Sequence, residues 1–455
     1  MAAHPANAIQ SVGLIDWIGR RPVATGQILL VMLLALALLL DGVDLKILAY
    51  FAPVIIGDWQ VSEVEFGPAL SAALVGMAIG SGVGGWIGDR FGPRRTAIAC
   101  VLLFGIGTLA CAYAPNLLML ILLRFISGMG FGGLNPNAFA LLADWLPRRV
   151  FPTAVAILAT CTPFGGVVGA GVALVAAPIV GWRGCFEIVG VASLLLAAGM
   201  IWLPESWTYL NRAGKRDAIP SLINRLFAKP DQPSLHYGPS DHVKHVDAGS
   251  IFESQIIRFT MGTAFCYFVA NVVTYGFNSW LYVALTAAGV DFRVAVQTGI
   301  AFNSVSMAVC LLTGWLTQRF GSKAVLITAA TLATVVTMWL GGLLYVSAPG
   351  SAPHQWQIYA ATGLAGGSTG CVLSTLTIIM TAGFPAGKRA TGVGFGIMAG
   401  RVGAILVTLA GGALLTWTGA DATSLFVALA VLALFIILAA LIIDRHVGYR
   451  ANQNI

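Results

Sequence analysis

The chain is dominated by about twelve apolar stretches, each long enough to cross a bilayer and separated by short polar turns. A transmembrane helix needs roughly 20 apolar residues. In this sequence 58% of the residues are hydrophobic and only 9% are charged, whereas a soluble domain carries roughly 25% charged residues. The sequence therefore excludes a soluble globular protein and predicts an all-α polytopic membrane protein with twelve transmembrane helices.

The spacing of the apolar runs fixes where the spans should lie. We expect them at 27–51, 66–87, 96–114, 117–142, 154–177, 184–203, 258–285, 294–316, 324–346, 356–382, 390–417 and 421–443. A polar stretch separates six spans from six, so we predict an N-terminal six-helix bundle over 1–204, a cytoplasmic linker over 205–257 and a C-terminal six-helix bundle over 258–455. The apolar run that follows the first 26 residues is too long for a signal peptide and contains acids, so we expect no cleaved leader.

The basic residues are distributed unequally between the two sets of loops. With both termini inside, 20 of the 25 Lys and Arg lie in inner segments and two lie in outer loops. This bias is a strong positive-inside signal, and it predicts cytoplasmic N and C termini. It also accounts for the net charge of +7 without a nucleic-acid partner. The seven cysteines lie in or beside apolar runs with no C-x-x-C pair, so we expect no disulfide, metal or cofactor.

An internal repeat relates the two halves of the chain. Residues 85–95 read GWIGDRFGPRR and residues 314–324 read GWLTQRFGSKA, and both follow the second span of their half. Duplication of a six-helix unit predicts this placement. Parallel repeats of this kind favour a binding site at the interface between the halves and alternating access by rocking.

The motif in the first copy resembles that of the major facilitator superfamily, G-x-x-x-D-R-x-G-x-R-R. Within that superfamily the chain is most similar to aromatic acid:proton symporters. The likeness rests on the D-G-x-D run at 41–44, the segment from Arg124 to Ala138, and the segment from Arg389 to Gly403. The resemblance implies import of a benzoate-type or hydroxybenzoate-type carboxylate with protons, across a bacterial inner membrane, by a protein that can act as a monomer.

Two acids lie in the first span, where ionisable groups are expensive and therefore suggest function. Asp41 and Asp44 are three residues apart and share one helix face. If that face lines a central cavity, either acid is a candidate for proton coupling; the alternative is that one of them only bonds a neighbouring helix. Lys46 lies about 200° around the helix from Asp44, so we expect it to point away from the acidic face, outside the site.

Two arginines lie inside later spans, where a guanidinium matches the geometry of a carboxylate. Arg401 is the natural counter-charge for an anionic substrate. Arg124 is a candidate for substrate contact or coupling, and it could equally form a permanent ion pair with Asp41 or Asp44. A further set of polar and aromatic residues could line the cavity: Asn135, Asn137, Asn271, Tyr275, Asn278, Trp280 and Asn303.

The inner loop that carries the superfamily motif is a candidate gate. One interpretation is a static anchor, in which the positive charges keep the loop on the inner side of the membrane. The resemblance implies instead a gate whose contacts form in one transport state and break in another. We assign this role to Asp89, Arg90, Gly92, Arg94 and Arg95, with plausible partners in the next inner loop at Asp144, Arg148 and Arg149.

Other functions are less well supported by the sequence. Another organic-anion carrier or a drug:proton antiporter remains the alternative within transport. No G-x-x-x-x-G-K-[ST] motif occurs, which argues against an ATP-driven pump. None of the six histidines lies well inside a span, which argues against a membrane enzyme, and the linker is too short for the output domain of a sensor.

Overall fold

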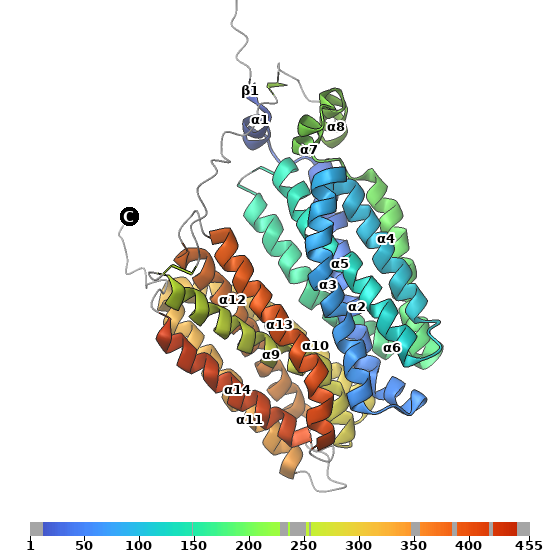
Figure 1. Cartoon of the computed structure of the whole chain (residues 1–455), viewed down its shortest axis with the longest axis vertical. Helices are drawn as coiled ribbons and strands as arrows, with labels where there is room; N and C mark the ends of the chain where they lie inside the picture. The colour runs from blue at the N-terminus through green and yellow to red at the C-terminus, as the bar shows by residue number, and fades with distance from the viewer. Residues whose placement is uncertain are drawn as a thin grey trace, which may run out of the picture.

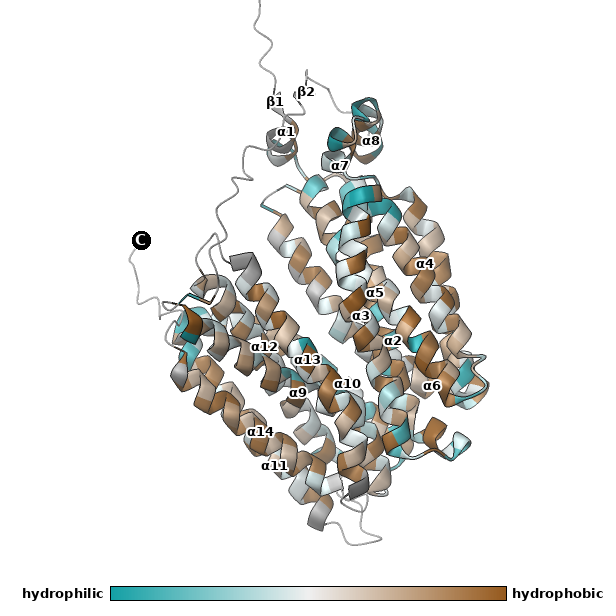
Figure 2. Ribbon diagram, viewed as in Figure 1, coloured by the Kyte–Doolittle hydropathy of each residue, from teal (hydrophilic) through white to brown (hydrophobic). Residues whose placement is uncertain are grey.

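The computed structural model describes residues 12–147, 149–227, 235–236, 252–253, 256–346, 355–384, 389–417 and 422–443. Two helical bundles lie side by side, the first built from the N-terminal half and the second from the C-terminal half (Figure 1). Eleven of the described helices are long and apolar enough to cross a membrane. Apolar residues cover most of their length, and polar ones gather at the ends (Figure 2).

The first bundle contains one helix that crosses twice. Its helices are α2 (Thr25–Trp59), α3 (Glu63–Phe91), α4 (Pro93–Cys111), α5 (Leu117–Trp145) and α6 (Phe151–Gly199). An unbroken helix of 49 residues would be about 74 Å long, more than twice the roughly 30 Å of a hydrocarbon core. Gly181 interrupts it with non-helical angles, φ 68° and ψ −178°. The two halves of α6 are therefore separate spans, and the predicted total of twelve is confirmed.

The second bundle repeats the pattern of the first. Its helices are α9 (Ile257–Ala287), α10 (Phe292–Phe320), α11 (Ser322–Val346), α12 (Gln355–Gly383), α13 (Arg389–Trp417) and α14 (Ala422–Ile442). The two copies of the sequence repeat form the same tight turn, because Gly92 and Gly321 each adopt a positive φ, 102° and 81°. Only glycine takes up such angles readily, which explains why both copies have it there.

Glycines allow α3 and α5 to pack with their backbones in contact. A Cβ atom placed on Gly80 would lie 2.2 Å from the carbonyl oxygen of Met129, and one on Gly132 would lie 2.0 Å from that of Met77. Such contacts are typical of small residues spaced four apart in membrane helices. The same close approach joins α2 to α6 at Gly165, and α10 to α12 at Gly366.

The hydrophobic core is shared between the bundles at one end of the molecule and divided at the other. One cluster joins residues of both bundles, from Tyr50 and Phe66 to Phe277 and Trp280. A second cluster lies within the first bundle alone, and a third lies within the second bundle alone. A small fourth cluster packs Ala404 of the second bundle against Leu74 and Met77 of the first. Apolar contact between the bundles therefore extends from one end as far as Ala404, and the other end is divided.

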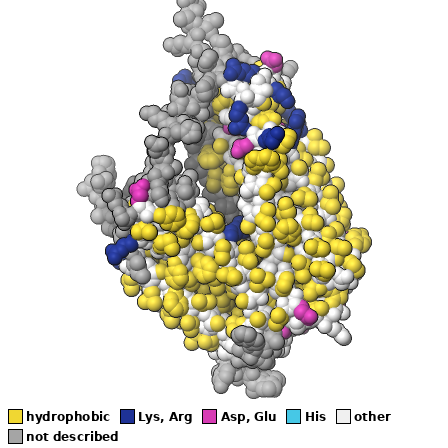
Figure 3. Space-filling model, in the orientation of Figure 1, with side chains coloured by type: hydrophobic (Ala, Val, Ile, Leu, Met, Phe, Trp, Pro, Cys, Tyr) yellow, Lys and Arg dark blue, Asp and Glu magenta, His cyan; other side chains and the backbone are white. Residues whose placement is uncertain are grey.

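The divided end carries the short helices α1 (Leu14–Arg20), α7 (Trp207–Arg212) and α8 (Ile219–Phe227) (Figure 1). The 3-10 turns η1 (Met200–Trp202) and η2 (Arg216–Ala218) flank α7, and the two-residue strands β1 (Val12–Gly13) and β2 (Leu235–His236) pair in parallel. Lys and Arg side chains gather at this end of the first bundle, and the surface is hollowed between the two bundles (Figure 3).

Candidate functional site

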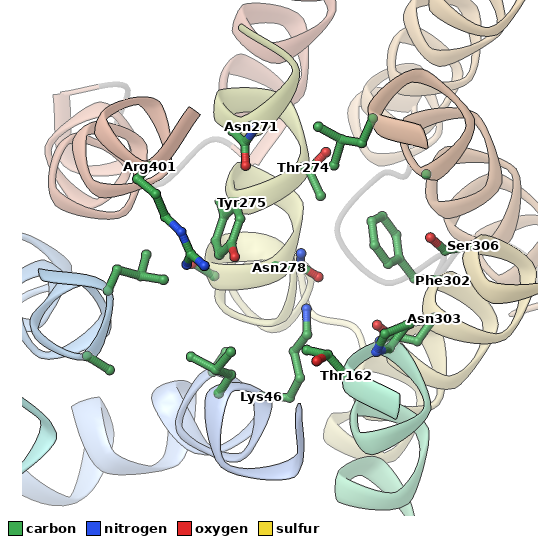
Figure 4. Close-up of a pocket in the computed structure, with 18 of the residues that line it drawn as sticks. Lys46, Thr162, Asn271, Thr274, Tyr275, Asn278, Phe302, Asn303, Ser306 and Arg401 are labelled. Carbon is green, nitrogen blue, oxygen red and sulfur yellow. The ribbon is translucent and has the colours of Figure 1, made fainter. Parts of the chain in front are cut away.

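A cavity of about 360 Å³ lies between the two bundles, at mid-height in the helices. This volume falls within the range of small-molecule sites. Helices from both bundles supply its walls, which combine aromatic rings, amides and hydroxyls with apolar side chains. The polar and aromatic lining includes Tyr267, Asn271, Tyr275, Asn278, Phe302, Asn303 and Ser306 (Figure 4).

Three basic side chains also line the cavity: Lys46, Arg124 and Arg401. Figure 4 shows Lys46 reaching toward Asn278 from α2 and Arg401 reaching toward Tyr275 from α13. Among the described residues that line the cavity there is no Asp or Glu. The space is therefore electropositive and suited to an anion.

The expectation that Lys46 points away from the site is wrong. Asp44 turns toward α4 and α5 inside the first bundle, whereas Lys46, two residues later, faces the cavity. The angle between the two side chains follows from helix geometry. The sequence does not show which side of α2 faces the cavity, because both the bundle interior and the cavity accept polar groups.

Asp44 and Arg124 form a buried ion pair. The Nη1 of Arg124 lies 2.7 Å from a carboxylate oxygen of Asp44, and its Nη2 donates to the main-chain oxygen of Asp44 at 3.2 Å. The hydroxyl of Thr108 donates to the other carboxylate oxygen at 2.9 Å. Both charged side chains are at most 1% exposed. The sequence leaves open whether Arg124 pairs with Asp41 or with Asp44, and in the structure it pairs with Asp44.

Asp41 is buried without the partners that Asp44 has. Its side chain is 2% exposed, and its Oδ1 has no hydrogen-bond partner among the described residues. Arg401, Asp44 and Arg124 are the charges that act on it. A buried carboxylate without a donor is costly in its ionised form. The two acids of the D-G-x-D run therefore have different environments.

Asn137 and Trp280 lie outside the cavity lining in this conformation. The Nδ2 of Asn137 donates to the carbonyl oxygens of Gly84 and Gly133, at 2.9 and 2.7 Å, and so ties α3 to α5. The indole N–H of Trp280 donates to the carbonyl of Val407 at 3.2 Å, which ties α9 to α13. We assign both residues to helix packing rather than to ligand contact.

The inner-loop motif contacts the chain just beyond the sixth span. A carboxylate oxygen of Glu205 accepts a hydrogen bond from the backbone N–H of Arg94 at 3.0 Å, and the carboxyl group lies against Gly92. The guanidinium of Arg94 donates to the carbonyl of Ile201, and that of Arg212 donates to the carbonyl of Asp89.

The other predicted gate residues also face the first bundle or the surface. Asp144 accepts hydrogen bonds from the hydroxyls of Ser206 and Thr208, rather than from the loop that carries Asp89. Arg90 is exposed, with its guanidinium 5.7 Å from the ring of Trp86. Arg95 is exposed as well, and Arg148 lies outside the described residues. Glu205 was missed as a loop partner, because its contact with Arg94 joins residues 111 positions apart.

With the fold and the cavity described, the chain can be compared with known proteins. The sequence profile of the Major Facilitator Superfamily matches residues 34–343. The chain belongs to the major facilitator superfamily. It is a multi-pass membrane transporter rather than an enzyme.

Curated relatives of this superfamily member are aromatic acid transporters. A gallate transporter of Pseudomonas putida is 30% identical over 97% of this chain and 96% of its own length. The 4-hydroxybenzoate transporter PcaK of Pseudomonas aeruginosa is 29% identical over 90% of each chain. A benzoate transport protein of Acinetobacter baylyi is 28% identical over 85% of this chain and 83% of its own.

Solved structures of the superfamily share the fold. A crystal structure of a D-xylose-proton symporter superposes with a TM-score of 0.72 at 17% identity, covering 94% of this chain and 99% of the other. A partially occluded inward open form of the Escherichia coli xylose transporter XylE gives 0.71, also at 17% identity.

Aromatic and backbone contacts close the cavity on the side away from α7 and α8. The rings of Tyr50 and Tyr282, one from each bundle, meet edge to face with centroids 4.7 Å apart. The hydroxyl of Tyr50 donates to the carbonyl of Gly166 at 2.7 Å. A Cβ on Gly412 of α13 would lie 2.3 Å from the carbonyl oxygen of Glu63 at the start of α3. In this superfamily member the two bundles are thus in direct contact at the closed end.

Proposed function

We propose that this transporter imports an aromatic carboxylate together with protons across the bacterial cytoplasmic membrane, by alternating access and as a monomer. The observation that carries the proposal is the electropositive cavity between the bundles, with the unpartnered acid Asp41 under the influence of Arg401. The names of the curated relatives support the substrate class.

The cavity suits an aromatic carboxylate in two ways. The one hydrogen bond that the described residues give the guanidinium of Arg401 is weak, to the sulfur of Met77 at 4.0 Å, so it has donors to offer a carboxylate. The rings of Tyr275 and Phe302 supply apolar walls for an aromatic ring. The Oδ1 of Asn278 is a buried acceptor without a partner, which suits a ring hydroxyl.

We assign the transported proton to Asp41 rather than to Asp44. The charge of Asp44 is compensated by Arg124, and Thr108 donates a hydrogen bond to it. The Oδ1 of Asp41 has no hydrogen-bond donor among the described residues, so this acid gains more from binding a proton. When a substrate carboxylate occupies Arg401, Asp41 loses the cation that favours its ionised form. Substrate and proton should therefore bind together.

The orientation that we propose places α7 and α8 in the cytoplasm, following the positive-inside rule. The hollow between the bundles then opens inward, and the contacts of Tyr50 and Tyr282 form the outer closure. Alternating access would break these contacts and bring the two divided inner cores together.

The cavity does not favour the alternative of a drug:proton antiporter. Lys46 and Arg401 would repel a cationic drug, and the described lining contains no acid that would offset this repulsion. Another organic anion remains the alternative that the geometry supports.

The test uses purified protein in liposomes, with radiolabelled benzoate, 4-hydroxybenzoate and gallate. Wild type should accumulate at least one acid when a pH gradient, acid outside, is imposed, and a protonophore should abolish accumulation. Asp41→Asn should retain exchange of labelled for unlabelled substrate but lose accumulation. The asparagine side chain cannot bind and release a proton, so transport is no longer coupled to the pH gradient. Arg401→Ala should lose both activities.

The matched control is Arg319→Ala, which removes an exposed arginine of the same bundle and should behave as wild type. Accumulation that ignores the protonophore would refute proton coupling. Normal accumulation by Asp41→Asn would refute the assignment of the proton, and failure to bind any aromatic acid would refute the substrate class.

A further inference from the structure

Lys46 is a cation in the cavity without a counter-charge. It is 8% exposed, and it lines the space with its ammonium group toward Asn278 (Figure 4). Among the described residues Arg124 is paired with Asp44, whereas neither Lys46 nor Arg401 forms an ion pair. An unpaired charge in a bilayer-spanning segment is a functional feature by default.

The charges around the cavity do not balance for a monoanion. Asp44 and Arg124 neutralise each other. The remaining charges are two cations, Lys46 and Arg401, and one acid, Asp41. When Asp41 binds its proton, two positive charges are left, and a substrate with one carboxylate neutralises only one of them. With a monocarboxylate bound, the closed cavity therefore holds either an uncompensated charge, which is strongly unfavourable, or a Lys46 that has given up its proton. A second anionic group on the substrate keeps Lys46 charged and paired.

We propose that the transported substrate carries two acidic groups, as in an aromatic dicarboxylate, and that Lys46 is the residue that selects for the second one. The inference rests on the proposed function, because it takes the carboxylate bound by Arg401 as the first anchor.

The positions of the two cations support this assignment. Lys46 belongs to α2 of the first bundle and Arg401 to α13 of the second, and both reach into one space beside Tyr275 and Asn278 (Figure 4). A ligand with an anionic group for each cation connects the two bundles. Such a ligand supplies the attraction that would draw the separate inner cores together, whereas a monocarboxylate held by Arg401 leaves Lys46 unbound.

The experiment measures binding to purified protein by isothermal titration calorimetry, with benzoate, 4-hydroxybenzoate, isophthalate and terephthalate as probes. Wild type should bind one of the two dicarboxylates at least about tenfold more tightly than benzoate, as is expected when a desolvated charge pair is added. Lys46→Met keeps an unbranched side chain only one atom shorter and removes the charge. It should abolish this preference, because the Kd of the preferred dicarboxylate should rise at least about tenfold more than the Kd of benzoate.

Two controls separate charge from folding. Lys46→Arg restores the cation and should restore the preference for the dicarboxylate. Lys215→Met removes an exposed lysine outside the cavity and should bind all four probes as wild type does. Gel filtration and a thermal unfolding curve establish that each variant is folded.

The outcomes distinguish this inference from the proposed function. Equal affinities for benzoate and both dicarboxylates in wild type would overturn the role of Lys46 but leave aromatic acid transport intact. A preference for 4-hydroxybenzoate over both dicarboxylates would do the same, since a phenol is neutral at pH 7. Equal weakening of benzoate and dicarboxylates by Lys46→Met would make Lys46 a general anion anchor. Binding of none of the four would refute the proposed function itself.

Discussion

The buried pair of Asp44 and Arg124 should stabilise the first bundle in a strongly non-additive way. In Arg124→Met the carboxylate of Asp44 remains buried, with the hydroxyl of Thr108 as its described side-chain donor. Removing one partner of a buried ion pair typically reduces the free energy of unfolding by about 3–5 kcal/mol.

The reverse substitution should be milder. In Asp44→Asn the amide oxygen can still accept from Arg124, and the guanidinium keeps its hydrogen bond to the main-chain oxygen of residue 44. We expect a loss of about 1–3 kcal/mol, the range for weakening a charged hydrogen bond. The double variant contains no buried charge at this position. It should therefore be more stable than Arg124→Met alone, with a coupling energy of about 2 kcal/mol or more.

The assay is reversible unfolding of the purified protein in mixed micelles, followed by tryptophan fluorescence, on wild type, both single variants and the double variant. Arg319→Met, at an exposed arginine, is the control for loss of an arginine as such. If the free energy of unfolding of the double variant falls by the sum of the decreases in the two single variants, the two side chains do not act as a pair and the reasoning is refuted.

Three further predictions test packing and closure. Gly80→Ala should destabilise the protein by about 1–3 kcal/mol through overpacking, whereas Gly82→Ala on the same helix, where a Cβ meets nothing within 4 Å, should be nearly neutral in the same unfolding assay. Asn137→Ala should reduce stability by about 1–2 kcal/mol through the loss of two hydrogen bonds and leave the Kd for substrate unchanged in calorimetry; a change in Kd would return this residue to the binding site. Tyr50→Ala removes the ring that meets Tyr282 of the other bundle and should increase labelling, by a membrane-impermeant reagent added outside, of a cysteine introduced at Asn278, while unchanged labelling would mean that this ring contact does not hold the outer closure.

Much of the fold follows from patterns within single helices. Apolar run length predicts the spans, and the repeated Arg-Phe-Gly run at 90–92 and 319–321 predicts the matching turns of the two halves. Glycines spaced four apart predict the close packing of α3 on α5. Each of these signals is local, so one sequence is enough to read it.

The site depends on relations between helices, which the sequence does not contain. A polar residue in a span of this fold has two possible destinations, the interior of its own bundle or the central cavity. Asp44 and Lys46 differ in this respect although they are two residues apart. Asn137 and Asn278 likewise read alike in the sequence, yet the first bonds α3 to α5 and the second borders the cavity. Only the rotation of each helix about its axis decides between the two, and packing against other helices sets that rotation.

The two bundles are in contact at one end and apart at the other, and this arrangement determines how an inhibitor can reach the cavity. The cavity is sealed by aromatic rings and backbone contacts at one end and is reached through the hollow at the end that carries α7 and α8. In this conformation, a blocking compound that is too bulky for about 360 Å³ can therefore enter between the bundles from that end alone. With this end in the cytoplasm, such a compound would have to enter the cell before it could bind this conformation, and a screen on intact cells would overlook compounds that do not cross the membrane.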